Sequence, residues 1–273
     1  MPPVKDRFPV KKKKHPPKQG GKRPEDQPRI SLEGRNVVLE ALGSDREIDE
    51  VFLDEGAEAS GKVRSIMELA RKRGIPLTAL DRRELDARSR TGSHQGVIAL
   101  ARPREDTSLK TLLETVDNTT DPTILVLGEV LYEQNLGAIL RTCDGAGAIG
   151  VVIPSRRSAP LSSVAARVSM GASEYIPVIR ESPTSALAQL SRAGFHIIGV
   201  EADGERSHFE ADLTGPVALV FGGEDKGLSE TLRGKCDRVV SIPLLGRISS
   251  LNISVAVAVV LYEKVRQQHA ASR

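Results

Sequence analysis

A chain of 273 residues, of which 39% are hydrophobic and 27% charged, is long enough for one large domain or two ordinary ones. Its longest purely aliphatic run, residues 255–261, is far shorter than the roughly 20 residues that cross a bilayer, so we expect no membrane partner. The two cysteines are too few for a disulfide framework. Neither lies at metal-ligand spacing from the other or from any of the five histidines, so we expect no metal.

The formal net charge of +3 conceals a basic N-terminal segment. Residues 1–29 hold ten Lys and Arg against three Asp and Glu, a charge of +7, which leaves −4 for the rest of the chain. A segment so rich in Pro and Lys cannot bury enough apolar surface to fold alone, so we expect a disordered tail. Such a tail attracts nucleic-acid phosphates without regard to sequence; the alternative is a solubilising extension. It lacks the apolar core of a secretory signal, and we therefore expect the protein to be cytoplasmic.

Residues 30–104 have the pattern of a compact α/β domain. Apolar residues recur at helical spacing in the segment 60–73, for example at Val63, Ile66 and Ala70. Helices are expected at 34–42, 60–73 and 84–89, and strands at 50–54, 75–80 and 97–101. The polar stretch 105–121, with a short helix at 109–116, is expected to link this domain to the next one.

From residue 122 to residue 273, strand-like and helix-like segments alternate regularly. Strands are expected at 124–127, 150–153, 175–179, 196–200, 217–221 and 239–242. Helices are expected at 136–145, 162–169, 184–193, 229–235 and 252–268. The segment 253–262 is rich in β-branched residues, but it continues without a break into good helix formers, which favours a helix. This alternation predicts a mostly parallel sheet that is covered by helices on both faces.

Three polar clusters follow expected strands of this second domain, at the edge where open parallel sheets bind ligands. They are Asn135-Leu136-Gly137 with Arg141-Thr142, residues 222–227, and residues 243–252. The second cluster has Leu228 where a phosphate loop needs a lysine, which disfavours nucleotide hydrolysis. No Gly-x-Gly-x-x-Gly follows the first strand and no histidine lies near the clusters, so neither a Rossmann cofactor site nor a Ser/His/Asp triad is supported. Taken singly, these residues have simpler roles as helix caps, a loop carboxylate and a surface arginine.

The sequences of the three clusters resemble the conserved motifs of the SpoU (TrmH-like) RNA 2′-O-ribose methyltransferases, which belong to the SPOUT, or α/β-knot, superfamily. The first motif is Asn135-Leu136-Gly137-Ala138-Ile139-Leu140-Arg141-Thr142. The second is Leu219-Val220-Phe221-Gly222-Gly223-Glu224-Asp225-Lys226-Gly227, and the third runs from Ser241-Ile242-Pro243-Leu244 to Ser249-Ser250-Leu251-Asn252-Ile253-Ser254-Val255-Ala256. The domain before them resembles this family's RNA substrate-binding domain, of ribosomal protein L30e type, in residues 34–42 and 94–97.

The resemblance implies S-adenosylmethionine as methyl donor, S-adenosylhomocysteine as product, a C-terminal trefoil knot, and a homodimer whose active site is completed across subunits. By match to the family's motifs, the donor is expected to be held by Gly222, Ile242 and Leu251. Further expected neighbours of the donor are Val200, Gly223, Leu244 and Asn252. The catalytic position falls on Arg141, assisted by Asn135, Glu224, Ser250 and Asn252.

RNA binding is expected to depend on contacts of Arg and Lys with phosphates, because the chain has no Trp and only eight other aromatic residues for base stacking. Residues expected to bind RNA are Arg167, Arg247, Arg35 and His94, with Tyr132 as a candidate for stacking and Arg156-Arg157 as a basic cluster near the acceptor path. The first domain and the motif sequences most resemble the branch of the family that modifies a guanosine of 23S ribosomal RNA. The alternatives are a transfer RNA ribose methyltransferase and a non-catalytic RNA-binding or antibiotic-resistance factor of the same fold.

Overall fold

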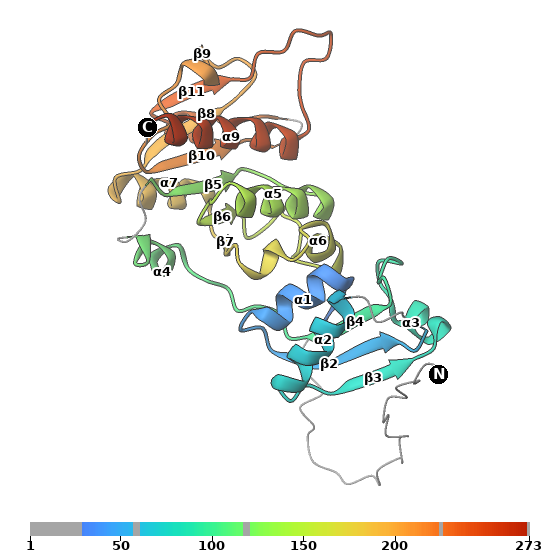
Figure 1. The fold of residues 1–273 in the computed structure, drawn as a ribbon. Helices are drawn as coiled ribbons and strands as arrows, with labels where there is room; N and C mark the ends of the chain where they lie inside the picture. The colour runs from blue at the N-terminus through green and yellow to red at the C-terminus, as the bar shows by residue number, and fades with distance from the viewer. Residues whose placement is uncertain (1–28, 57–60, 117–120, 224–225, 272–273) are drawn as a thin grey trace. The chain divides into compact units, whose positions relative to one another are not determined.

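The computed structural model describes residues 29–56, 61–116, 121–223 and 226–271, and the chain divides between residues 103 and 104 into two compact units. The expected basic tail lies almost entirely outside these ranges. Figure 1 shows the elements of each unit.

The first unit is a four-stranded mixed sheet with helices. Its elements are β1 (Ile30–Glu33), α1 (Arg35–Gly43), β2 (Ile48–Asp54), α2 (Gly61–Lys72), β3 (Leu77–Leu80), α3 (Arg82–Arg88) and β4 (Val97–Ala101). The strand order is β1-β4-β2-β3, with β4 antiparallel to both neighbours and β2 parallel to β3. Strand β1 was not expected from the sequence. It is a short edge strand that depends on pairing with β4, a long-range contact that local sequence does not reveal.

The second unit contains a seven-stranded sheet in the order β7-β6-β5-β10-β8-β11-β9. Its strands are β5 (Thr123–Leu127), β6 (Gly150–Ile153), β7 (Val178–Arg180), β8 (His196–Val200), β9 (Arg206–Ser207), β10 (Val217–Phe221) and β11 (Arg238–Ser241). Its helices are α4 (Leu109–Leu113), α5 (Glu133–Gly145), α6 (Ser163–Val168), α7 (Pro183–Arg192), α8 (Glu230–Arg233) and α9 (Ile253–Ala271), with short 3₁₀ helices η3 (Ala172–Glu174) and η4 (His208–Glu210). Every neighbouring pair of these strands is parallel.

Both faces of this sheet are buried, as the alternation in the sequence predicts. In β5, Leu125 and Leu127 face a core shared with α5 and α9, whereas Ile124 and Val126 face a core shared with α4 and α7. Two-sided burial explains why the strands read as continuous apolar runs. The mostly parallel sheet is therefore confirmed; the trefoil knot stays a prediction.

Helix α9 confirms the helical interpretation of the segment that begins at Ile253. Val257, Val260, Leu261 and Lys264 lie on the buried side, at the spacing of a helical face. The packing surface therefore outweighs the preference of β-branched residues for strands. Among the described residues, none of the helices combines the length and the apolar character that crossing a membrane requires.

Two further segments differ from expectation. The strand expected at 175–179 starts only at Val178, because η3 precedes it and Pro177 has no N–H for the ladder. The expected linker belongs in part to the second unit, since Leu109 and Leu112 of α4 are buried in the core beside α7. The short amphipathic helix thus anchors the start of the second unit.

Lys264 is a buried cation that ties α9 to the chain before β10. Its side chain is 1% exposed, and its Nζ donates hydrogen bonds to the carbonyl oxygens of Leu213 at 2.7 Å and Gly215 at 2.8 Å. Burial lowers the pKa of Lys264 to about 8, and the charges of Asp121 and Asp212 oppose this shift only in part.

This pKa predicts an unusual dependence of stability on pH. Between pH 8 and the ordinary lysine pKa of about 10.4, the unfolded chain binds a proton that the folded chain does not, so the contribution of Lys264 to the unfolding free energy rises with pH. We expect wild type to gain stability relative to Lys264→Met over this range, by at most about 1.4 kcal/mol per pH unit. Urea unfolding of both proteins at several pH values measures the difference; a constant difference would contradict the assignment.

Candidate functional site

A pocket of about 370 Å³ lies at the carboxyl ends of β10, β8 and β11, three neighbouring parallel strands of the second unit. This volume falls within the range of roughly 300–1,000 Å³ usual for small-molecule sites. Ligands bind at this edge of parallel sheets because the loops that leave the strands converge there. The lining consists of Val200, Glu201, Ala202, Phe221, Gly222, Gly223, Lys226, Gly227, Ile242, Leu244, Ser249, Ser250, Leu251, Ile253 and Ala256.

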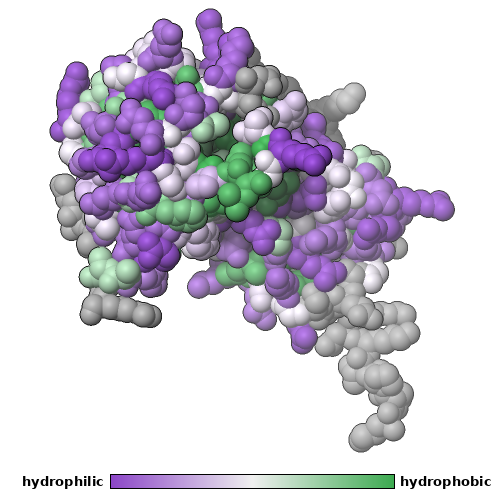
Figure 2. Space-filling model, turned by 90° about the horizontal axis from the view of Figure 1, so that it is seen from above, coloured by the Kyte–Doolittle hydropathy of each residue, from purple (hydrophilic) through white to green (hydrophobic). Residues whose placement is uncertain are grey.

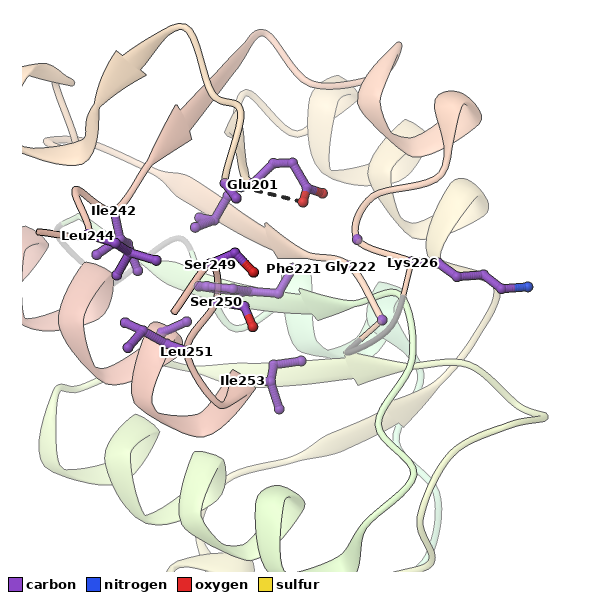
Figure 3. A pocket seen from close by; sticks show the side chains of 15 residues that line it. Glu201, Phe221, Gly222, Lys226, Ile242, Leu244, Ser249, Ser250, Leu251 and Ile253 are labelled. Atoms are coloured by element: carbon purple, nitrogen blue, oxygen red, sulfur yellow. Dashed lines mark hydrogen bonds between the residues drawn. The ribbon is translucent and has the colours of Figure 1, made fainter. Parts of the chain in front are cut away.

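Of the seven residues that the family resemblance assigned to the donor site, six line the pocket: Val200, Gly222, Gly223, Ile242, Leu244 and Leu251. The seventh, Asn252, does not line it. The six come from the ends of three strands and from the loop before α9, which is why they are far apart in sequence. In Figure 3, Ile242 and Leu244 lie on one side of the pocket, Leu251 and Ile253 on another, and Glu201 across from them.

Two short segments after β10, Gly222-Gly223 and Gly227-Leu228, lie against each other at the pocket wall, and together they are called the glycine turn. Gly223 and Gly227 exchange two backbone hydrogen bonds of 3.0 and 2.9 Å. A Cβ atom on Gly222 would lie 1.9 Å from the carbonyl carbon of Gly227, so no larger residue fits without moving the turn. Gly227 has a φ of +60° and a Cβ there would lie 2.3 Å from Oε2 of Glu201. Gly222 is therefore required by space, and Gly227 by its left-handed backbone conformation.

Glu201 is a pocket residue that the sequence reasoning missed. It follows β8 directly, and its Oε2 accepts a hydrogen bond from the backbone N–H of Leu228, which holds the glycine turn against β8. The sequence gives one indication of this role: Glu201 follows Val200 directly, at the end of an expected strand. The sequence alone could not show that the side chain reaches the next loop.

The first and third polar clusters meet through a side-chain hydrogen bond. Nδ2 of Asn252 donates to Oδ1 of Asn135 at 3.1 Å, although the two residues are 117 positions apart. Oδ1 of Asn252 also accepts from the backbone N–H of Ser254 at 2.9 Å, so it caps the start of α9. Asn252 thus combines the capping role with a link to α5, and Ser250 lines the pocket beside it.

Arg141, the residue at the predicted catalytic position, is not in the pocket of this chain. It is exposed on α5. Glu224 lies outside the described residues. A single chain therefore presents the predicted cofactor residues without the predicted guanidinium.

The residues of the second unit that were expected to bind RNA differ in exposure. Arg247 is exposed in the loop before α9, whereas Arg167 is half-buried on α6 and its Nε is buried. Arg157 forms an ion pair with Glu129, with Nε and Oε1 3.2 Å apart. Tyr132 precedes α5 and is 58% exposed, as a stacking residue must be. Their contacts with RNA stay predictions.

In the first unit, His94 has a structural environment. Its side chain is 1% exposed, its Nε2 lies 2.8 Å from Oδ1 of Asp86, and its Nδ1 accepts from the N–H of Gly96 at 3.1 Å. With both ring nitrogens occupied, the geometry does not favour the direct RNA contact expected for His94. Arg35 is partly exposed, and its Nε donates to the carbonyl oxygen of Gln95 at 3.1 Å, so it lies beside the same loop.

A buried carboxylate fixes that loop. Glu33 is fully buried, and its oxygens accept hydrogen bonds from the side chains of Ser89 and Thr91 and from the backbone N–H groups of Arg90 and Thr91. Burial raises the pKa of Glu33, but these hydrogen bonds together outweigh burial and lower it below its usual value. Glu33 therefore stays ionised near neutral pH and holds the loop in one conformation.

Across the described ranges, no group of three or more His, Cys, Asp or Glu side chains is placed to bind a metal ion. Cys143 is fully buried, and burial raises the pKa of its thiol far above the usual range. Burial likewise raises the pKa of Cys236 to about 11. Both cysteines are therefore poor nucleophiles near neutral pH.

Comparisons with known proteins agree with this geometry. Residues 122–262 match the SpoU rRNA Methylase family, and residues 31–107 match the family described as RNA 2′-O ribose methyltransferase substrate binding. The 23S rRNA (guanosine-2′-O-)-methyltransferase RlmB of Pseudomonas putida is 37% identical over 227 residues, which cover 82% of this chain and 90% of the relative. A protein of Mycolicibacterium vanbaalenii that is named as an uncharacterized tRNA/rRNA methyltransferase is 38% identical over 255 residues, which cover 93% of this chain and 81% of the relative.

The chain is also similar to solved structures of SpoU methyltransferases. The SpoU methyltransferase AviRb from Streptomyces viridochromogenes, in complex with the cofactor AdoMet, has a TM-score of 0.73 and 26% identity. The match covers 88% of this chain and 90% of that structure. It therefore extends over both units.

Proposed function

The chain belongs to the SpoU rRNA methylase family, and we propose that it transfers a methyl group from S-adenosylmethionine to the ribose 2′-hydroxyl of a guanosine in 23S ribosomal RNA. The observation that carries this proposal is the pocket at β10, β8 and β11, which gathers six of the seven predicted donor residues. The 37% identity to a 23S rRNA guanosine methyltransferase, over 90% of its length, supports this substrate. We accordingly place the protein in ribosomal RNA processing in the cytoplasm.

A transfer RNA substrate is the second candidate, because some relatives are named as tRNA/rRNA methyltransferases. A non-catalytic role is less well supported. The glycine turn is intact and Asn135 still bonds Asn252, and a protein that only bound RNA would not need either feature.

The pocket suits the donor in both size and lining. When bound, S-adenosylmethionine supplies a methyl group that its sulfonium has already activated. Gly222, Ile242 and Leu251 would hold it, because the turn presents backbone groups and the two aliphatic side chains form apolar walls. The remaining tasks for the protein are to align the acceptor ribose and to stabilise charge on its oxygen.

We assign the second task to Arg141. A guanidinium stays protonated in proteins, so Arg141 is better suited to hold the neighbouring phosphate and stabilise the developing alkoxide than to act as a base. The hydroxyl proton would then pass to water or to a phosphate oxygen. The Asn135–Asn252 hydrogen bond holds the start of α9 against α5, which carries Arg141.

In a homodimer, Arg141 of one subunit would lie at the pocket of the other subunit. Figure 2 shows hydrophobic side chains gathered around a hollow on one face of the molecule. The loop before α9 and the helix itself expose large apolar side chains, including Leu245 at 100%, Ile248 at 77% and Val255 at 47%. Exposed apolar surface of this kind is typical of an interface, and Arg141 is exposed on α5, which packs against α9.

Transfer of tritiated methyl groups tests the substrate. We expect incorporation from labelled S-adenosylmethionine into unmodified 23S ribosomal RNA and only background labelling of transfer RNA. Mapping of alkali-resistant linkages is expected to place the label on a guanosine 2′-oxygen. Labelling of a base, or of transfer RNA alone, would contradict the proposal.

A further inference from the structure

The carboxylate of Glu201 lies in the proposed donor pocket but belongs to none of the three motifs. It lines the pocket together with apolar side chains such as Val200, Phe221 and Ile242, and with the polar Lys226, Ser249 and Ser250. A carboxylate in such surroundings is retained only where hydrogen-bond donors compensate for its partial removal from water. The protein provides one strong donor, the backbone N–H of Leu228, to Oε2.

The other oxygen of this carboxylate is left with weak partners. Oε1 lies 3.4 Å from the backbone N–H of Ala202, at the limit of a hydrogen bond. The nearby cations are directed elsewhere. Nη1 of Arg233 lies 2.6 Å from Oδ1 of Asp203, and Lys226 points away from the pocket in Figure 3. An ionised carboxylate has about four acceptor positions, so Glu201 retains acceptor capacity at the pocket wall.

The chemistry of the donor supplies what this oxygen lacks. S-adenosylmethionine carries two adjacent ribose hydroxyls, and a carboxylate at the end of a parallel strand is a well-known partner for a ribose hydroxyl in nucleotide sites. We propose that Glu201 is a donor-binding residue, whose carboxylate accepts a hydrogen bond from the ribose hydroxyls of S-adenosylmethionine while it holds the glycine turn through Leu228. This inference rests on the proposed function and adds a specific contact to it.

The Glu201 side chain then couples ribose binding to the position of the glycine turn. Because Gly227 packs directly on Oε2, the position of the carboxylate and the position of the turn are fixed together. A ribose bound to Glu201 would therefore also help to hold Gly227 and Leu228 in place. The turn in its present position would in the same way orient the carboxylate for the ribose.

Calorimetry with S-adenosylhomocysteine and its 2′-deoxy analogue tests the contact. In wild type we expect the deoxy compound to bind about 10-fold to 100-fold more weakly, as expected for loss of a hydrogen bond to a charged group. In Glu201→Ala, the ratio of the dissociation constants of the two compounds should fall to near one. In Glu201→Gln, which can still accept from the N–H of Leu228, it should fall to a few-fold. Glu205→Gln, an exposed carboxylate on the same connection that does not line the pocket, should keep the wild-type preference.

The ratio of the two affinities separates this role from a purely structural one. A variant that merely disturbs the turn weakens both ligands equally, so an unchanged ratio in Glu201→Ala would overturn the proposal. A wild-type protein with no preference for the ribo compound would overturn it as well. If wild type binds neither ligand nor S-adenosylmethionine, the proposed function itself fails; if only the ratio test fails, the proposed function stands.

Discussion

Replacement of Gly222 by alanine is expected to abolish binding of S-adenosylmethionine. The added Cβ would lie 1.9 Å from the carbonyl carbon of Gly227 and 2.3 Å from the backbone nitrogen of Leu228. Neither atom belongs to a flexible side chain, so the backbone of Gly227 and Leu228 must move. Because the turn forms one wall of the pocket and carries the N–H that bonds Glu201, both the shape of the wall and its polar contacts would be lost.

We expect the affinity of Gly222→Ala for the donor to fall by a factor on the order of 100 or more, since several contacts fail together. Gly246→Ala is the matched control, because a Cβ at Gly246 meets no atom within 4 Å. Calorimetric titration of both variants measures the effect, and thermal unfolding checks that each is folded. Near-normal affinity in Gly222→Ala would show that the turn is not part of the donor site.

The strands of the second unit could be predicted from sequence because their physical signal is local. Val217–Phe221 is an unbroken apolar run, and its side chains are buried on both faces of the sheet. The donor residues at the strand ends followed from the family resemblance and from the rule that ligands bind at this edge. Sequence placed them near one another only because parallel strands bring their carboxyl ends together.

Most of the features that sequence could not supply depend on contacts between distant segments. Glu201 acts on a backbone N–H 27 residues away, and Asn252 bonds a residue 117 positions earlier. His94 is a different case: its ring contacts Asp86 and Gly96, which are close in sequence, but the family resemblance that assigned it to RNA binding carries no information on its burial. The sequence also could not show that Leu109 and Leu112 belong to the second unit. A short polar segment with two leucines does not indicate which core will bury them.

Loss of the Arg141 side chain is expected to abolish methyl transfer while donor binding survives. Arg141 is exposed on α5 and does not line the pocket of its own chain, so Arg141→Ala removes no contact from the donor site. If Arg141 stabilises charge on the ribose oxygen, its removal should lower kcat by a factor on the order of 100 to 1,000, as for other groups that stabilise an oxyanion. Arg141→Lys should recover only part of this, because a lysine cannot bind a phosphate through two parallel N–H groups. Retained turnover in Arg141→Ala would remove Arg141 from the chemistry.

The same variant decides whether the site is shared between subunits. In a dimer where Arg141 of one chain serves the pocket of its partner, a mixed dimer of Arg141→Ala and Gly222→Ala contains one site with both an intact pocket and an intact arginine. Random pairing of equal amounts makes half of the dimers mixed, each with one of two sites working, so we expect about a quarter of wild-type activity from two inactive proteins. Were Arg141 to act on its own chain's pocket, every site in the mixture would lack one of the two elements. Co-refolding the two variants and measuring transfer to 23S ribosomal RNA distinguishes the arrangements, because only a shared site can recover activity.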